Sequence, residues 1–485
     1  MRHFRGSVGC LAVVLAAMAG CSEVGQEAPG TVRDTQPLSI PPAAPESDPW
    51  YFQWAGDKVF FVATEAVHGR ELWVSDGTST GTQLVLDINP GGGSSSPNQL
   101  VLGDGGLYFR ANDGLGERLW VSDGTPGGTR PLLTGSEAES LEVMAFAPAG
   151  GSLFLAVPHP YPGAGLWKSD GTPAGTVLLK SLNVAELLKE VDGTLFFLAE
   201  DWETGPALWK SDGTPEGTVP LTALSMSGPQ VRDSERVGGT LFFTLQSWGD
   251  SSTRELWKSD GTPGGTVLLK VFSNVPSIPG YSLSPFEDLT AVGGTLFFVG
   301  YDETHGPHLW KSDGTGVGTV RVMPSGLPAN WWFEPKFLLG VNGLVYFTAQ
   351  TMESGNDPWT FSYELWRSDG TAEGTVRLTN FPGEGFDSPE CVPVGWVGSR
   401  ALFSTFKYSE PRSRELWASD GTVEGTVKLR AFAPDFTGAF FWMSGSSQNA
   451  FFFAGDDGVH GREPWKTDGT PEGTVMLRDI WADGP

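Results

Sequence analysis

One short motif recurs nine times along this chain and restricts it to a repeat architecture. The motif is LWxSDGTxxGT. Its first eight copies keep this pattern, while the ninth reads PWKTDGTPEGT, with Pro464 and Thr467 as its departures. Its tryptophans are Trp73, Trp120, Trp167, Trp209, Trp257, Trp310, Trp366, Trp417 and Trp465. Self-similarity at a period of 42 to 56 residues is typical of solenoids and propellers, in which each repeat is one supersecondary unit.

Each repeat has the pattern of four β-strands. A short aromatic run, often Leu-Phe-Phe, precedes each Trp, and such residues favour strands. Pairs such as Asp192-Gly193 precede several of these runs and suit the two-residue turn of a hairpin. The run at 177–180 is typical of a fourth strand, and the link at 90–97 is long and irregular. Helical signals are scarce, and only 185–191 suggests a turn of helix.

Four antiparallel strands in each repeat predict an all-β protein, a β-propeller of nine blades over residues 49–481. We expect one closed ring, because the spacing of the motifs leaves no linker between copies. The alternatives are eight blades with an extra unit, or two smaller rings. Since the first and last repeats each keep four strands, no strand is left for a shared closing blade. The ring should therefore close by face-to-face packing of blades.

The repeated residues of the motif have structural roles. Leu and Trp alternate on the third strand, so each can point into one of two interblade layers. Ser-Asp-Gly-Thr is a turn in which Asp accepts backbone hydrogen bonds and Gly takes a left-handed conformation. We interpret the nine aspartates as fold determinants: Asp76, Asp123, Asp170, Asp212, Asp260, Asp313, Asp369, Asp420 and Asp468. Calcium is the alternative, but one carboxylate falls short of the about six oxygens that calcium needs, so we predict no cofactor.

These turns resemble the Asp-box hairpins of sialidases, which lie between the third and fourth strands of a blade and are structural. The repeats themselves resemble those of bacterial ELWxxDGT-repeat proteins, which are predicted to be exported, over about residues 50–481. The resemblance implies a propeller-like repeat. It implies no defined activity and adds no substrate.

The first residues form a sorting signal and are not part of the fold. Residues 1–20 contain basic residues and then an apolar stretch that is too short to span a membrane. Cys21 follows, which resembles the lipobox of bacterial lipoproteins, although Met18 stands where Leu is usual. We predict lipidation at Cys21 and a flexible tether over 21–48, with an ordinary secretory signal as the alternative. Ser22 in place of Asp favours an envelope lipoprotein of the outer membrane, whose partner is the membrane itself.

Charge and the remaining reactive side chains give few functional signals. The chain has 31 basic and 57 acidic residues, a net charge of −26, which argues against nucleic acid as a partner. Cys391 is the one thiol of the predicted propeller and has no motif around it. His68 and His460 occupy equivalent loops in the first and last repeats and become neighbours if the ring closes. A metal shared with Asp456 and Asp457 is one interpretation, and we prefer a turn residue inherited by duplication.

Motifs of known catalytic chemistry are missing from the sequence. It contains no GxSxG elbow, HExxH, P-loop or paired CxxC. We expect the aromatic runs at 331–333 and 440–442 to line the core or channel in preference to a carbohydrate or peptide site. The variable loops, including 280–287 and 323–335, should leave the blades on the face opposite the repeated turns, where binding usually occurs.

Two functions fit these features. We expect a surface-anchored lipoprotein that acts as a non-enzymatic binding or scaffold propeller for a protein or glycan ligand. The alternative is a secreted, glycosidase-like hydrolase that uses acidic residues of the variable-loop face. Two or three carboxylates gathered in a central pocket would favour the hydrolase.

Overall fold

The computed structural model describes residues 46–133, 141–172, 174–201, 203, 205–224, 226, 228–250, 253–272, 286–302, 306–327, 331–353, 362–381, 389–407, 412–433 and 445–482. Within these ranges the secondary structure consists of strands and turns, without a helix. The predicted signal at 1–20, Cys21 and the predicted tether up to residue 45 lie outside the described residues.

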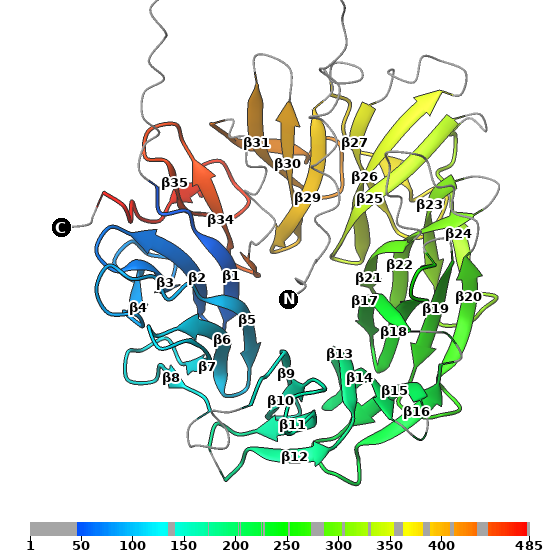
Figure 1. Ribbon diagram of the computed structural model, residues 1–485. Helices are drawn as coiled ribbons and strands as arrows, with labels where there is room; N and C mark the ends of the chain where they lie inside the picture. Colours follow the sequence, from blue (N-terminus) through cyan, green and yellow to red (C-terminus); the bar gives the residue numbers. More distant parts are fainter. Residues whose placement is uncertain are drawn as a thin grey trace, which may run out of the picture.

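The strands form nine antiparallel sheets of four, arranged as blades in a ring (Figure 1). Within each sheet the strands follow their order in the chain, so β1 lies at the ring centre and β4 at the rim. The ends of the ring meet where β33 to β36 of blade 9 lie beside β1 to β4 of blade 1. The predicted nine-bladed propeller in one ring is confirmed, and neither alternative applies.

The strand bounds follow, blade by blade. Blades 1 to 3 contain β1 (Trp50–Ala55), β2 (Lys58–Glu65), β3 (Gly69–Ser75), β4 (Gln83–Leu86), β5 (Asn98–Gly103), β6 (Gly106–Asn112), β7 (Glu117–Ser122), β8 (Arg130–Pro131), β9 (Ala145–Ala149), β10 (Ser152–Val157), β11 (Gly165–Ser169) and β12 (Val177–Lys180). Blades 4 to 6 contain β13 (Asn183–Val191), β14 (Thr194–Asp201), β15 (Gly205–Ser211), β16 (Val219–Ala223), β17 (Gln230–Val237), β18 (Thr240–Gln246), β19 (Arg254–Ser259), β20 (Val267–Phe272), β21 (Phe286–Val292), β22 (Thr295–Asp302), β23 (Gly306–Ser312) and β24 (Val320–Val322). Blades 7 to 9 contain β25 (Trp331–Val341), β26 (Leu344–Glu353), β27 (Ser362–Ser368), β28 (Val376–Arg377), β29 (Glu390–Val397), β30 (Arg400–Lys407), β31 (Ser413–Ser419), β32 (Val427–Phe432), β33 (Gly445–Ser446), β34 (Phe451–Asp456), β35 (Arg462–Thr467) and β36 (Val475–Met476).

The segment 185–191 forms most of β13, so the expected turn of helix is wrong. Its pairing with β14 shifts register between Val184 and Glu186 and again between Leu187 and Glu190. Such bulges insert residues that break the alternation of a strand. The resulting apolar spacing imitates a helical period, which explains the error.

The Leu and the Trp of each motif hold neighbouring blades together face to face. Leu72 of blade 1 and Trp120 of blade 2 lie in one buried cluster with Phe60 and Phe109. Trp73, on the other face of the same strand, packs in the cluster between blades 1 and 9. The remaining interfaces repeat this pairing of one blade's Leu with the next blade's Trp. Because a fully buried large apolar side chain contributes roughly 1.5–3 kcal/mol, these layers dominate the stability of the ring.

The Ser-Asp-Gly-Thr turn is held by a repeated set of hydrogen bonds, as blade 5 illustrates. Asp260 Oδ1 accepts bonds from the Thr262 N–H (2.9 Å) and hydroxyl (2.7 Å). Thr262 Oγ1 in turn accepts the Gly265 N–H at 3.0 Å. The hydroxyls of Ser259 and Thr266 meet at 2.8 Å across the base of the turn. The Asp260 carboxylate also fills the space that a Cβ on Gly265 would need.

Ring closure uses the same contact that joins blade 1 to blade 2. Buried Glu463 of blade 9 accepts hydrogen bonds from the Ser47 N–H (3.1 Å), the Ser47 hydroxyl (2.7 Å) and the Ile480 N–H (2.9 Å). In blade 1, buried Glu71 likewise accepts the N–H and the hydroxyl of Ser95. The segment before β1 therefore docks on blade 9 as the link before β5 docks on blade 1.

Basic side chains add a second contact across the seam between blades 9 and 1. Lys466 Nζ donates to the Gly77 carbonyl at 2.8 Å, and Arg478 donates to the Thr82 carbonyl at 2.8 Å. Lys311 donates to the Gly370 carbonyl in the same way between blades 6 and 7, also at 2.8 Å. The seam thus closes by packing and polar contacts, as the lack of a shared strand implies.

We predict that Gly265→Ala destabilises the protein by about 1–3 kcal/mol, because the new Cβ displaces the Asp260 carboxylate from its bonds to Thr262. Gly264→Ala is the matched control, since a Cβ there meets nothing within 4 Å. Urea unfolding followed by tryptophan fluorescence measures both variants. Equal unfolding midpoints for the two variants would show that the space filled by Asp260 is not required.

Removal of the seam carboxylate has a larger expected effect than removal of its counterpart in blade 8. Glu463→Ala leaves the buried N–H groups of Ser47 and Ile480 without their acceptor, which costs about 1–3 kcal/mol for each unpaired group. Glu415 holds the indole N–H of Trp417 (3.1 Å) and the half-exposed Lys428 (3.1 Å), so Glu415→Ala should cost less than about 1 kcal/mol. Thermal unfolding and hydrogen exchange at residues 46–52 check the difference.

Candidate functional site

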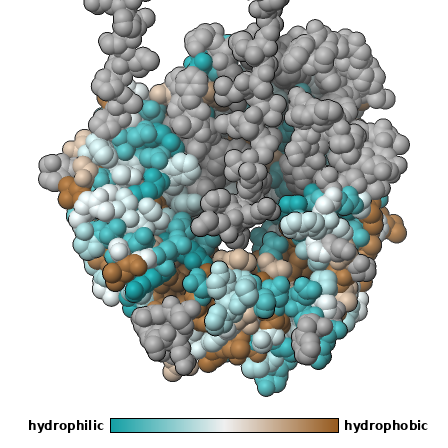
Figure 2. Space-filling view, viewed as in Figure 1, coloured by the Kyte–Doolittle hydropathy of each residue, from teal (hydrophilic) through white to brown (hydrophobic). Residues whose placement is uncertain are grey.

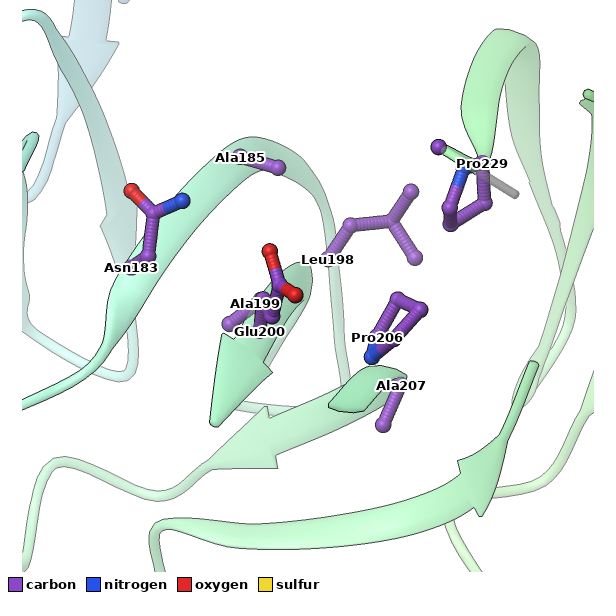
Figure 3. Close-up of a pocket in the computed structure, with 9 residues that line it drawn as sticks. Asn183, Ala185, Leu198, Ala199, Glu200, Pro206, Ala207 and Pro229 are labelled. Atoms are coloured by element: carbon purple, nitrogen blue, oxygen red, sulfur yellow. The ribbon is translucent and has the colours of Figure 1, made fainter. Parts of the chain in front are cut away.

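A pocket lies between blades 4 and 5, at the end of the sheets where the loops between second and third strands emerge. It encloses about 450 Å³, part of it open to solvent. Its walls are Asn183, Ala185, Leu198, Ala199, Glu200, Pro206, Ala207, Gly228 and Pro229. Figure 3 shows Asn183 and Ala185 on β13, Glu200 on the neighbouring strand, and Pro229 across the pocket. The pocket is therefore on the face where the variable loops emerge, opposite the Ser-Asp-Gly-Thr turns.

Two glutamates share the face of blade 4 that forms this pocket. Asn183 pairs with Glu200, and Glu186 pairs with Leu198, across the antiparallel strands β13 and β14. Paired residues and residues two apart point to the same side of a sheet, so Glu186 and Glu200 both face blade 5. The backbones of diagonal neighbours of this kind lie roughly 7–8 Å apart, which is within reach of two glutamate side chains.

Glu186 has the electrostatic properties of an acid that is protonated near neutral pH. Its side chain is exposed to solvent on the inner strand of the blade, although neighbouring protein atoms partly desolvate its carboxyl group. This desolvation raises the pKa of Glu186 to about 7, against the lowering effects of the Val231 N–H bond and of the charge of Arg232. A proton on a carboxyl group beside a pocket is a requirement for general acid catalysis.

An exposed tryptophan stands at the rim of the pocket. Trp248 is 69% exposed in the loop between β18 and β19. Its backbone N–H donates to the carbonyl of Gly228, which lines the pocket, at 3.2 Å. A solvent-exposed indole ring suits the apolar face of a sugar.

Two further carboxylates near the ring centre join blades and lie outside the pocket. Asp233 accepts the Leu289 N–H of blade 6 and the Ser234 N–H, each at 2.7 Å. Asp288 accepts the Leu338 N–H of blade 7 at 3.2 Å. Burial raises the pKa of Asp233, to about 6, and also raises that of Asp288. Both groups bind backbone amides of the next inner strand, as Glu186 binds the Val231 N–H, but they are only partly exposed whereas Glu186 is open to solvent. We therefore assign Asp233 and Asp288 a structural role.

Sequence analysis did not single out Glu186, Glu200 or Trp248. Glu186 falls in the segment that suggested a helix, where the bulge in β13 hides the strand pattern. Glu200 and Trp248 lie near the ends of second strands, where the repeats differ most from one another. The one available signal is that each breaks the local apolar pattern of its repeat.

The aspartates and tryptophans of the motif lie elsewhere. The nine aspartates are exposed at the opposite face, and hydrogen bonds from the following threonine lower their pKa, as Thr262 does for Asp260. The tryptophans lie in the layers between blades, as Trp209 does at 1% exposed. Neither set contributes to the pocket between blades 4 and 5.

Each of the two histidines considered for a metal is bound to a carboxylate of its own loop. His68 Nδ1 contacts Glu65, and His460 Nδ1 lies 2.9 Å from Asp457. These carboxylates raise the pKa of both histidines. No group of three His, Cys, Asp or Glu suited to a metal occurs among the described residues.

The aromatic runs are only partly covered by the structure. Phe333 is buried and packs edge-on against Phe347 and Trp366, with centroids 6.1 Å and 5.3 Å away, so it belongs to the core. The side chains of Trp331 and Trp332, and the run at 440–442, lie outside the described residues. Figure 2 shows hydrophilic and hydrophobic residues interspersed over the described part of the face that is seen in Figure 1. No helix among the described residues is long and apolar enough to cross a membrane.

Comparisons with known proteins find solved structures that align with this chain at low identity. No family model and no curated protein matches the chain. A puromycin hydrolase aligns at 14% identity and a TM-score of 0.41, covering 84% of this chain and 58% of its own. A prolyl endopeptidase aligns at 10% and 0.42, with coverages of 87% and 54%. Prolyl oligopeptidase B from Galerina marginata aligns at 15% and 0.41, with coverages of 79% and 50%. This chain therefore spans about half to three fifths of the length of these three proteins.

These matches correct the expected function. We expected a non-enzymatic binding or scaffold propeller, whereas the matching proteins are hydrolases, which agrees better with the alternative. The likeness concerns the fold at these identities, so neither their substrates nor the roles of their residues are transferred to this chain.

Proposed function

We propose that this protein is an exported glycoside hydrolase whose site is the pocket between blades 4 and 5. The observation that carries the proposal is the pairing of Glu186, whose pKa is raised to about 7, with Glu200 on the same face of β13 and β14. Glycosidases need one protonated and one ionised carboxyl group on either side of the bond they cleave. Trp248 supplies an aromatic surface beside them on which a sugar ring can stack.

Each carboxyl group has a defined part in this chemistry. Glu186 donates its proton to the glycosidic oxygen as the bond from that oxygen to the anomeric carbon breaks. The Glu200 carboxylate either attacks the anomeric carbon or takes a proton from the water that does so. Water is added across the bond in both cases, and the released sugar leaves with a hydroxyl group. Asn183, whose amide lines the pocket, can bind a sugar hydroxyl.

We propose that Cys21 anchors the protein in the bacterial envelope, at the outer membrane. The basic residues, apolar stretch and Cys21 of the first segment support this location. The net charge of −26 keeps such a protein soluble at the membrane surface. A substrate of this enzyme would then be a glycan outside the inner membrane.

Substitution of either glutamate should abolish hydrolysis without unfolding the protein. Glu186→Gln keeps an oxygen that can accept the Val231 N–H but cannot donate a proton as an acid, so activity should fall at least about 100-fold. Glu200→Gln should do the same. The assay is a panel of p-nitrophenyl glycosides and neutral polysaccharides with reducing-sugar detection. Glu203→Gln, an exposed carboxylate of the next loop that is not part of the pocket wall, is the matched control and should retain activity. Lack of hydrolysis by the unsubstituted protein, or full activity in either glutamine variant, would contradict the proposal.

The pH profile should show an alkaline limb that belongs to Glu186. Its pKa is raised, so the acid form is present below about pH 7 and is lost as the pH rises through that value; kcat/KM should fall there. A 2,4-dinitrophenyl glycoside has a leaving group that needs no proton. With this substrate, Glu186→Gln should recover much of its rate and lose the alkaline limb. An alkaline limb that persists in the variant would assign the titration to another group.

Cys21→Ala should release the protein from the membrane fraction, since lipidation requires the thiol. Fractionation and labelling with radioactive palmitate measure the change. Cys391→Ala is the control, because that thiol is fully buried in the propeller. Membrane association that survives Cys21→Ala would point to an uncleaved or ordinary secretory signal.

A further inference from the structure

A second groove opens on the opposite face of the ring, where blade 9 meets blade 1. It encloses about 950 Å³, part of it open to solvent. Its walls include Trp54, Asp57, Asp76, Gln448, Asn449 and Lys466. Asp76 belongs to a Ser-Asp-Gly-Thr turn, so this groove and the pocket between blades 4 and 5 lie on opposite faces. No residue lines both.

One wall of the groove is the turn between the inner and second strands of blade 9. β34 begins at Phe451, and the inner strand β33 ends at Ser446. The hairpin that follows it is tightened by Ser447, whose hydroxyl donates to the Ala450 carbonyl (2.7 Å) and accepts the Ala450 N–H (3.0 Å). Gln448 and Asn449 are exposed at the tip of this turn, beside the groove. This turn thus lines the groove with two amides.

The floor of the groove is aromatic and its rim is polar. Half-buried Trp54 meets Phe452 edge-on, with ring centroids 5.1 Å apart. Lys466 is held by the Gly77 carbonyl at 2.8 Å, and Asp57 is exposed. Amide side chains both donate and accept hydrogen bonds, and a carboxylate accepts them, which matches the hydroxyl groups of a sugar. The aromatic floor suits the apolar face of a sugar ring.

We propose that this groove is a non-catalytic site for one or two units of a neutral oligosaccharide. Asp57 and Asp76 repel an anionic chain, whereas the paired amides and the aromatic floor fit an uncharged one. The site goes beyond the proposed hydrolysis and does not depend on it. A bound sugar would contact blades 1 and 9 together and so bridge the seam that no strand covers.

The test is a titration of neutral hexaoses (cello-, xylo-, laminari-, malto- and chitohexaose) into the mature protein by calorimetry. The protein carries Glu186→Gln so that no substrate is consumed. We expect at least one hexaose to bind, and the double variant Gln448→Ala/Asn449→Ala to weaken its affinity at least about tenfold. Both side chains are exposed, so this variant keeps the fold. Asp57→Ala, also at an exposed turn, should weaken binding as well. Gln83→Ala, an exposed amide on the outer strand of blade 1, is the matched control and should leave the affinity unchanged.

Absence of binding by every hexaose, or an affinity that is the same in the double variant, would overturn the inference. Its failure can be told apart from failure of the proposed hydrolysis. A protein that binds through Gln448 and Asn449 yet hydrolyses no glycoside keeps this site and loses the catalytic one. A protein whose hydrolysis depends on Glu186 but whose affinity for hexaoses is unchanged by the double variant keeps the catalytic site and loses this one.

Discussion

The ring depends on one contact, the packing of a leucine from each of blades 1 to 8 against a tryptophan of the next blade. Both residues stand on the third strand, on opposite faces, so one short stretch of sequence supplies half of two interfaces. Leu72 with Trp120 and Leu416 with Trp465 illustrate the pattern at distant parts of the ring. The hydrogen-bonded turn that follows sets where the fourth strand begins. Because each such blade carries these two apolar faces, the partner that buries them is another blade.

The seam between blades 9 and 1 differs from the other junctions in its apolar packing and shares their carboxylate contact. Pro464 replaces Leu in the ninth motif, so the seam lacks the leucine that the other clusters contain. Glu463 and Ser47 nonetheless reproduce the contact of Glu71 with Ser95. The ring therefore closes through the same kind of contact that joins consecutive blades, although blades 9 and 1 are not consecutive in the chain.

Much of the fold could be predicted from the sequence because the same pattern occurs nine times. Each copy supports the strand assignment of the others, so the number of strands, the number of blades and the roles of Leu and Trp could be predicted. Segment 185–191 was misjudged because inner strands are bulged, and a bulge removes the alternation on which recognition of a strand depends. The candidate site was not predictable for a related reason. Glu186 and Glu200 share one face through the register of β13 with β14, and Trp248 comes to the rim of the pocket from another blade. None of these positions belongs to the motif, so repetition gives no information about them.

The shared form of the junctions has a consequence for how such a ring can change. Blades 1 to 8 each offer a leucine face and a tryptophan face, and the link between blades docks in the same way at the seam as between blades 1 and 2. A recombination event that inserts or deletes one whole repeat would leave every face matched. Only the angle between adjacent blades would have to adjust. The number of blades is thus set by the history of duplication more than by any contact within a blade, and a ring of this kind can be enlarged without redesign of its interfaces.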